Sequence, residues 1–148
     1  MPTIESATRT DTGLASQLRV SLVRLTRRLR NEREPSNELS TASISVLGVL
    51  IREGELTIGE LAAHERVQPP SMTRTVSALE ADGYVVRRPS PDDGRSVIVG
   101  LSDQGRETLL ADRRRRDAWL AQQLRTLTPD ERDLLRKVVP IIERLSKA

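Results

Sequence analysis

The stretch that decides the fold is residues 57–101, TIGELAAHERVQPPSMTRTVSALEADGYVVRRPSPDDGRSVIVGL. Thr57 is followed three residues later by Glu60, which is the pattern of a capping box. In a capping box the two side chains satisfy backbone N–H groups at the start of a helix. The sequence therefore predicts a short helix over about 58–65.

A second helix start follows at Pro69 and Pro70, because proline tolerates the first turn of a helix, where its missing N–H would have no partner. Gly83 marks the end of this helix, since glycine tolerates the left-handed conformation just past a helix end. The helix predicted over about 69–82 has one apolar stripe, formed by Met72, Val76 and Leu79. The other side chains face elsewhere, and its short hydroxyls and arginine can present donors to base edges and phosphates in a major groove.

After Gly83 the pattern changes from helix to strand. Apolar residues occupy 84–86 and 97–99, and the loop 89–95 between them is rich in proline, aspartate and glycine. This predicts a β-hairpin with Arg95 at its tip. Helix, turn, helix and hairpin in this order form a winged helix-turn-helix, whose second helix enters the major groove. An arginine at the tip suits the minor groove, whose negative potential attracts it.

The hairpin resembles the signature of the multiple-antibiotic-resistance regulator (MarR) family. That signature has Asp-x-Arg, a strand, Leu-Thr or Leu-Ser, two residues and glycine, and the matching residues are Asp93, Arg95, Leu101, Ser102 and Gly105. Residues 70–87, PSMTRTVSALEADGYVVR, resemble the same family. The resemblance implies a sequence-specific DNA-binding regulator, most often a repressor, that is a homodimer on double-stranded DNA with a roughly palindromic operator.

The resemblance also implies which residues contact DNA. On the second helix these would meet the major groove and its phosphates: Pro70, Ser71, Thr73, Arg74, Thr75 and Ser77. Thr73 has the alternative of facing the helix core, and Arg74 that of bridging to Glu80 or another helix residue. At the hairpin, Arg95 would enter the minor groove, Asp93 would hold its guanidinium by a charge-assisted hydrogen bond, and Gly94 would keep the tip narrow. One of Arg87 and Arg88 would reach a phosphate, with an exposed ion pair as the equal alternative.

Amphipathic helices are predicted on both sides of this lobe. A leucine stripe runs through 13–34, and a helix over about 41–52 is apolar nearly all round and therefore interior. Ser102 caps a long helix to about residue 126. Thr128 and Glu131 form a second capping box, which opens a last helix that Pro140 interrupts.

The outer helices carry more apolar surface than a small winged-helix lobe can cover, so we expect two chains to pack them together. The expected organisation is a disordered tail over 1–12 and a single domain over 13–148. Within that domain, 55–101 form the DNA-binding lobe, and 13–34 with 103–148 form the dimerisation helices. The expected fold class is mostly α with a small β-hairpin wing (α+β).

Charge keeps a second class of function open. The whole chain has a formal net charge of +3, but residues 57–101 contain five arginines against six carboxylates, a net charge of −1. A basic footprint is the usual first sign of nucleic-acid binding, so DNA binding is inferred here from motif placement. The alternative is a winged-helix module that binds protein without specific DNA binding.

Other classes are disfavoured. The chain has no cysteine, which excludes disulfides and thiol sensing, and His64 alone makes a poor metal site. With no nucleophile motif or phosphate loop, we expect no enzyme and no cofactor. No apolar run suits a membrane span or signal peptide, so we expect a cytoplasmic protein.

The resemblance implies a small-molecule effector, often an aromatic acid. The chain has one tyrosine, one tryptophan and no phenylalanine, so it offers such a ligand few aromatic side chains for stacking. The sequence identifies no pocket residues for it.

Overall fold

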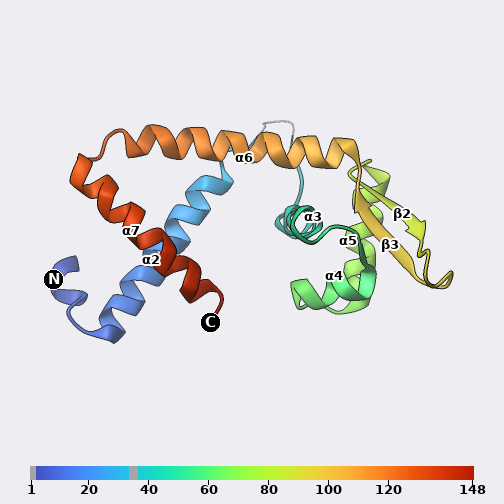
Figure 1. Cartoon of the computed structure of the whole chain (residues 1–148), viewed down its shortest axis with the longest axis horizontal. Helices are drawn as coiled ribbons and strands as arrows, with labels where there is room; N and C mark the ends of the chain where they lie inside the picture. The colour runs from blue at the N-terminus through green and yellow to red at the C-terminus, as the bar shows by residue number, and fades with distance from the viewer. Residues whose placement is uncertain (1–2, 34–36) are drawn as a thin grey trace. The chain divides into compact units, whose positions relative to one another are not determined.

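A computed structural model describes residues 3–33 and 37–148 of the chain (Figure 1). By its internal contacts the chain divides into two compact units, residues 33–113 and residues 1–32 with 114–148. We call the first the winged-helix unit and the second the helical unit. Glu34, the expected end of the first helix, and Pro35 and Ser36 of the expected break lie outside the described residues.

The winged-helix unit contains the helices and strands that the central stretch predicts. Its elements are α3 (Thr41–Glu53), β1 (Leu56–Thr57), α4 (Ile58–Glu65), α5 (Pro69–Ala81), β2 (Val85–Pro89), β3 (Val97–Leu101) and the first half of α6 (Asp103–Leu124). The capping box is confirmed, because the Glu60 backbone N–H donates to the Thr57 Oγ1 (3.1 Å) and the Thr57 N–H to the Glu60 Oε1 (3.2 Å). The predicted helix over 58–65 therefore has the expected bounds.

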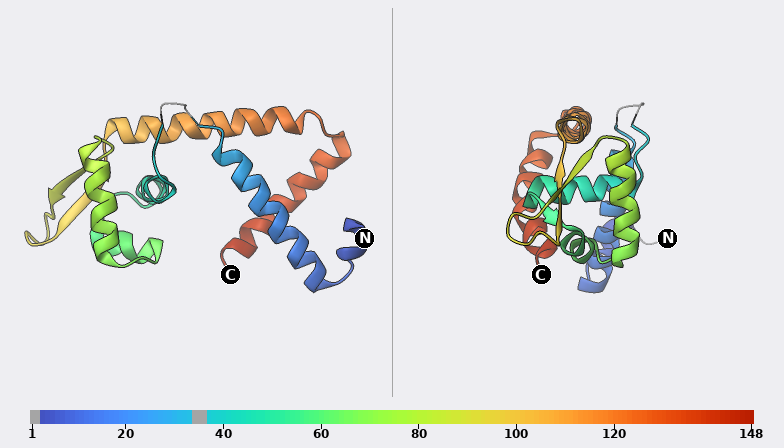
Figure 2. Two further views of the ribbon diagram at one scale, coloured as in Figure 1. Left: turned by 180° about the vertical axis from the view of Figure 1, so that it is seen from behind. Right: turned by 90° about the vertical axis from the view of Figure 1, so that its right-hand side faces the viewer.

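The sheet has one strand more than the predicted hairpin. Its strands are antiparallel in the order β1-β3-β2, so the two-residue strand β1 adds to the free edge of β3, with Leu56 opposite Val99. In the hairpin itself, Arg87 lies opposite Val99 and Arg88 opposite Ile98. Figure 2 shows the hairpin extending beside α5 as a narrow ribbon. The result is a winged helix-turn-helix, as predicted.

The core of this unit is a single cluster with members from all of its helices and from β2 and β3, and Leu56 of β1 packs against it. The apolar stripe predicted on α5 is confirmed, because Met72, Val76 and Leu79 are buried. Helix α3 is interior, as expected, and buries four aliphatic side chains. The other contributions to the core are Leu61 and Ala62 of α4, Val85 of β2, Val99 of β3 and Leu109 of α6. Burying about a dozen apolar side chains, each contributing about 1.5–3 kcal/mol, holds α5 and the hairpin in one body.

Two glycines set the junction between α5, β2 and α6. Gly83 has a φ of +84°, which only glycine adopts without strain. Gly105 lies so close to β2 that an added Cβ would stand 2.0 Å from the carbonyl oxygen of Tyr84. Between them Ser102 donates its hydroxyl to the Gly83 carbonyl (2.6 Å) and accepts the Gly105 N–H (3.0 Å). The Leu-Ser-x-x-Gly part of the motif is therefore a structural clamp.

The helical unit consists of α1 (Ile4–Ala7), α2 (Asp11–Arg30), the second half of α6 and α7 (Pro129–Ser146). The segment 1–12, expected to be disordered, thus contains α1 and the start of α2, whose N-cap Thr10 accepts the Gly13 N–H (3.1 Å). The capping box of Thr128 and Glu131 is confirmed, and α7 continues as a helix through Pro140. Neither α2 nor α7 contains a buried residue.

Helices α2 and α7 cross in the cartoon (Figure 1) and together line an apolar groove of about 460 Å³. Their apolar side chains remain exposed along both helices: Leu14, Leu22, Val23 and Leu25 on α2, and Leu134, Leu135, Val138, Val139, Ile141 and Leu145 on α7. Within the described residues, no helix is long and apolar enough to cross a membrane.

Candidate nucleic-acid interface

The outward face of α5 is opposite its buried stripe. A rotation of about 100° per residue places Pro70, Arg74 and Ser77 on this face, and all three are exposed. Pro69 and Pro70 occupy the first turn and have no backbone N–H to donate, and the N–H groups of Ser71 and Met72 both donate to the Gln68 carbonyl. The polar groups that this end of α5 offers are therefore side chains. The start of α5 therefore offers DNA a convex polar surface that the core holds from behind.

Hydroxyl groups on α5 have different hydrogen-bond states. Thr73 donates its hydroxyl to the carbonyl of Pro69 (3.0 Å), and Thr75 donates to the carbonyl of Ser71 (3.2 Å). Ser77 instead accepts a hydrogen bond of 2.6 Å from the guanidinium of Arg87. Thr73 is exposed, so the alternative that it faces the helix core is wrong. Ser71 is half-buried, at the flank of α5.

Two arginines of the predicted site are unpaired. Arg74 on α5 and Arg95 in the hairpin loop are both exposed, and neither forms an ion pair within the part of the chain that the structure describes. The alternative that Arg74 bridges to Glu80 is wrong, because the carboxylate of Glu80 lies 3.6 Å from the Nε of Arg87. Arg74 and Arg95 are therefore both available to an anionic partner.

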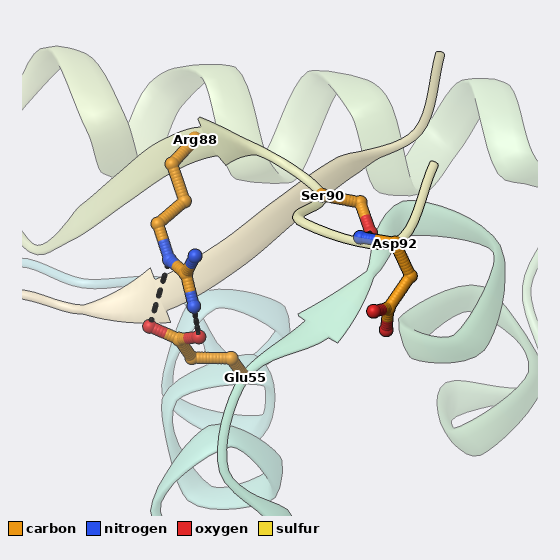
Figure 3. Close-up of polar contacts among 4 residues, drawn as sticks. All are labelled: Glu55, Arg88, Ser90 and Asp92. Carbon is orange, nitrogen blue, oxygen red and sulfur yellow. Dashed lines mark hydrogen bonds and ion pairs between the residues drawn. The ribbon is translucent and has the colours of Figure 1, made fainter. Parts of the chain in front are cut away.

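The two arginines of β2 are engaged by carboxylates of the same unit. Arg88 makes a bidentate ion pair with Glu55 (Figure 3). The Arg88 Nε lies 3.2 Å from the Glu55 Oε1, and a second guanidinium nitrogen donates to the Glu55 Oε2. The hydrogen bond from Arg88 holds the pKa of the Glu55 carboxyl below its ordinary value, and the same bond raises the pKa of Arg88. Both side chains are about half exposed, so solvent screens the pair. Arg87 and Arg88 are therefore both in ion pairs in this structure, which was the expected alternative to a phosphate contact.

The hairpin tip corrects the role expected of Asp93. Its Oδ1 accepts the backbone N–H of Arg95 (3.0 Å) and its Oδ2 accepts the hydroxyl of Ser96 (3.2 Å). Among the described residues no hydrogen bond or ion pair joins Asp93 to the Arg95 guanidinium. The short Asp93 side chain reaches the adjacent backbone N–H first, as in the turns that aspartate favours. Asp93 therefore shapes the loop backbone and leaves the guanidinium of Arg95 unpaired.

The same loop is tied at its base by Ser90, whose hydroxyl accepts the N–H of Asp92 (3.3 Å) (Figure 3). Ser90 also donates its backbone N–H to the Ser96 carbonyl (2.9 Å). Gly94, expected to keep the tip narrow, would meet nothing within 4 Å if it carried a Cβ. Any steric need for Gly94 must therefore come from a bound partner.

The sequence reasoning missed the contacts that connect distant segments. It identified Arg87 and Arg88 as phosphate or ion-pair residues but not their partners, because Glu55 lies 33 positions from Arg88 and Ser77 lies ten from Arg87. Local patterns carry no signal for such pairs. No group of three or more His, Asp and Glu side chains that could hold a metal occurs among residues 3–33 and 37–148, and His64 is exposed.

Comparison with known proteins agrees with the MarR resemblance of the winged-helix unit. A family model described as the MarR family matches residues 38–96. The chain is 46% identical to an uncharacterized HTH-type transcriptional regulator of Mycobacterium bovis, over 89% of this chain and 92% of that protein. It is 30% identical to the HTH-type transcriptional repressor MdtR of Bacillus subtilis, over 80% of this chain and 78% of the repressor. A crystal structure of a transcriptional regulator protein from Pseudomonas aeruginosa is similar with a TM-score of 0.86 and 34% identity, covering 99% of both chains.

Proposed function

Because the chain belongs to the MarR family of transcriptional regulators, we propose that it is a homodimeric repressor that binds a roughly palindromic operator through α5 and the hairpin. The observation that carries this proposal is the pairing state of the arginines. Arg74 and Arg95 are exposed and unpaired among the described residues, on two elements held by one core. The carboxylates of Glu80 and Glu55 are paired with Arg87 and Arg88 instead.

In this proposal α5 enters the major groove with its N-terminal half. Arg74 then donates to a guanine edge or a phosphate, and Ser71 and Ser77 contact phosphates or bases. Thr73 and Thr75 have already given their hydroxyl hydrogens to the helix backbone. They can therefore offer DNA only acceptor lone pairs and methyl groups. Pro70 packs against the DNA backbone or a thymine methyl.

The hairpin loop reaches the adjacent minor groove with Arg95. Asp93 supports this by fixing the backbone at Arg95 rather than by pairing with its side chain. A guanidinium without an intramolecular carboxylate loses no ion pair when it enters a groove. Gly94 contributes a tip without a side chain, which matters only if the groove walls approach it.

The dimer is proposed because the apolar faces of α2 and α7 are uncovered in a single chain. Leu134, Val139 and Leu145 of α7 are each about 60% exposed, and a helix with such a stripe is stable in water only when it is packed. A two-fold axis through a paired helical unit gives two copies of α5. Two such helices read half-sites about 34 Å apart on successive major grooves, so the operator is palindromic.

Repression is proposed because a relative of the chain is named as a repressor. Release by a small-molecule ligand completes the proposal. Such a ligand would act by binding one spacing of the two recognition helices more tightly than the other. It would find little aromatic surface, since the guanidinium of Arg28 covers Trp119 at 4.3 Å from the ring centroid and Tyr84 is packed against the core.

Selection of bound sequences from a random duplex pool tests the proposal, with the unaltered protein, Arg74→Ala and Arg95→Ala compared. We expect a palindrome, with Arg74→Ala relaxing preference at specific major-groove bases by about 1–3 kcal/mol. Arg95→Ala should relax preference at positions where the minor groove is narrow. Recovery of the same pool by all three proteins would contradict the proposal.

A protein-binding module is the second candidate, favoured by the net charge of −1 over residues 57–101. The two functions differ in their response to salt. Binding to DNA through several phosphates weakens steeply as salt rises, whereas a module that does not bind DNA shows no affinity for any duplex even at low salt.

A further inference from the structure

We propose that Arg87 is a positioning residue, which fixes the Ser77 hydroxyl so that it donates its hydrogen to a DNA phosphate oxygen. This inference rests on the proposed function and assigns a role to a contact between β2 and α5. In it Arg87 acts through Ser77 and does not itself contact the operator.

The geometry holds the half-buried Arg87 side chain against α5. One guanidinium nitrogen donates to the Ser77 Oγ at 2.6 Å, and the Nε lies 3.6 Å from a carboxylate oxygen of Glu80. The Nε is buried and makes no hydrogen bond to any described residue. Only 27% of the Arg87 side chain is exposed, compared with 48% of the Arg88 side chain. The guanidinium is therefore wedged between α5 and its own strand, and it cannot reach out to a phosphate without giving up both partners.

The hydrogen-bond inventory then determines what Ser77 can offer. A hydroxyl has one hydrogen to donate and two lone pairs that accept. An arginine has no acceptor, so the Ser77 oxygen must accept from Arg87 and keeps its own hydrogen. Among the described residues that hydrogen has no acceptor. Thr73 and Thr75, by contrast, donate theirs to Pro69 and Ser71.

Ser77 is therefore unlike its neighbouring threonines on α5. Phosphate oxygens only accept hydrogen bonds, so they are suited to a hydroxyl that is held as a donor. The charged Arg87 also strengthens the Ser77 donor, because successive hydrogen bonds polarise one another. Ser77 lies on the outward face of α5, one turn from Arg74, where it can reach the DNA backbone.

A double-mutant cycle tests this role on the duplex recovered from the selection described above. We would measure the affinity of the unaltered protein, Ser77→Ala, Arg87→Met and the double variant. Loss of a hydrogen bond to a charged group costs about tenfold or more in affinity. We expect each single variant to weaken binding about tenfold. In the protein that already carries Ser77→Ala, we expect Arg87→Met to add less than about threefold.

Two further measurements separate positioning from a structural role. Neutral methylphosphonates would replace single phosphates of the duplex in turn. We expect the replacement of one phosphate in each half-site to weaken binding by the unaltered protein and to have no effect on binding by Ser77→Ala or Arg87→Met. A distorted α5 would instead lose affinity whichever phosphate is replaced. Arg87→Lys, which keeps a charged donor, should restore part of the loss and part of this sensitivity.

Arg88→Met is the matched control, because Arg88 is the next arginine of the same strand and pairs with Glu55 instead of with α5. Whatever its own cost, it should weaken binding by the same factor with and without Ser77→Ala. The inference would be overturned if the affinity losses of Ser77→Ala and Arg87→Met multiplied in the double variant. It would also be overturned if Arg87→Met kept the methylphosphonate sensitivity of the unaltered protein. Either result would leave the proposed function intact. Absence of duplex binding by the unaltered protein would overturn both.

Discussion

The availability of each arginine depends on which carboxylate lies beside it. Arg87 and Arg88 are adjacent in sequence, yet one is held by Ser77 and Glu80 and the other by Glu55. Arg95 has no such partner among the described residues, because Asp93 is engaged with the loop backbone. The net charge of the lobe is therefore a poor guide to DNA binding, since paired arginines and free arginines contribute equally to that count.

Replacement of Arg95 by alanine should weaken operator binding without affecting stability. The side chain is exposed and makes no ion pair within the described chain, so thermal unfolding should stay unchanged. Affinity should fall, and the slope of log affinity against log salt should become shallower by about 1, as for one lost phosphate or groove contact. Fluorescence anisotropy at several salt concentrations measures both. An unchanged affinity would remove Arg95 from the interface.

The Glu55–Arg88 pair should give a small, pH-dependent contribution to stability. Arg88 lowers the pKa of the Glu55 carboxyl in the folded chain, so the pair stabilises the fold above the ordinary pKa of glutamate. That contribution is lost as the pH falls through the lowered folded pKa. Glu55→Gln should therefore unfold at a slightly lower urea concentration than the unaltered protein at neutral pH, and the two should converge in acid. A difference that persists in acid would mean that Glu55 stabilises the fold by packing alone.

At the scale of elements, the start of α6 is the joint that sets the hairpin against α5. Ser102 bonds to the carbonyl of Gly83 and the N–H of Gly105, and Gly105 lies against the backbone of Tyr84. These contacts connect the end of α5, the start of β2 and the start of α6. The packing of this junction therefore accounts for the glycine of the family motif.

Gly105→Ala should destabilise the fold by about 1–3 kcal/mol, the range for overpacking in a tight site, because its Cβ would stand 2.0 Å from a backbone oxygen. Gly94→Ala is the matched control: it meets nothing within 4 Å and should leave chemical denaturation unchanged while weakening operator binding. Equal stability of the two variants would contradict the packing role of Gly105.

Local patterns predicted these elements well. The capping boxes at Thr57 and Thr128, the stripe on α5 and the stop at Gly83 depend on residues within one or two turns, so sequence alone reveals them. Strand β1 was missed, because two residues have no periodicity and form a strand only by pairing with β3.

The candidate site was likewise predictable only in part. The sequence predicted which site residues lie on α5 and which lie in the hairpin. The role expected of Asp93 was wrong, and the partners of Arg87 were absent from the prediction, since each depends on which of several nearby groups the side chain reaches. Whether the ten predicted residues contact DNA stays a prediction.

At the scale of the whole molecule, the proposed dimer accounts for the exposed apolar side chains of α2 and α7. Fully burying one leucine or valine side chain contributes about 1.5–3 kcal/mol, and a two-fold interface counts each side chain twice. The proposed dimer would bury several of these side chains on each helix, and this burial must exceed the cost of association.

A charge placed on this face should separate the dimer. Val139→Asp introduces a carboxylate at a side chain that is 60% exposed in the single chain, so it should leave α7 helical and shift the protein to monomers. Lys137→Ala, a change at a polar position on the same helix, should leave the dimer intact. Sedimentation velocity measures the assembly state. An unaltered protein that is already monomeric at micromolar concentration would contradict the dimer.

The most direct test of the central claim is the affinity of the unaltered protein for its selected duplex and for a scrambled duplex of the same composition, measured across salt concentrations. A dimeric sequence reader should prefer the selected duplex by about 10³-fold or more. It should lose affinity for both duplexes as salt rises, because phosphate contacts release counterions. Equal affinity for the two duplexes at every salt concentration, or no binding to either, would contradict the account.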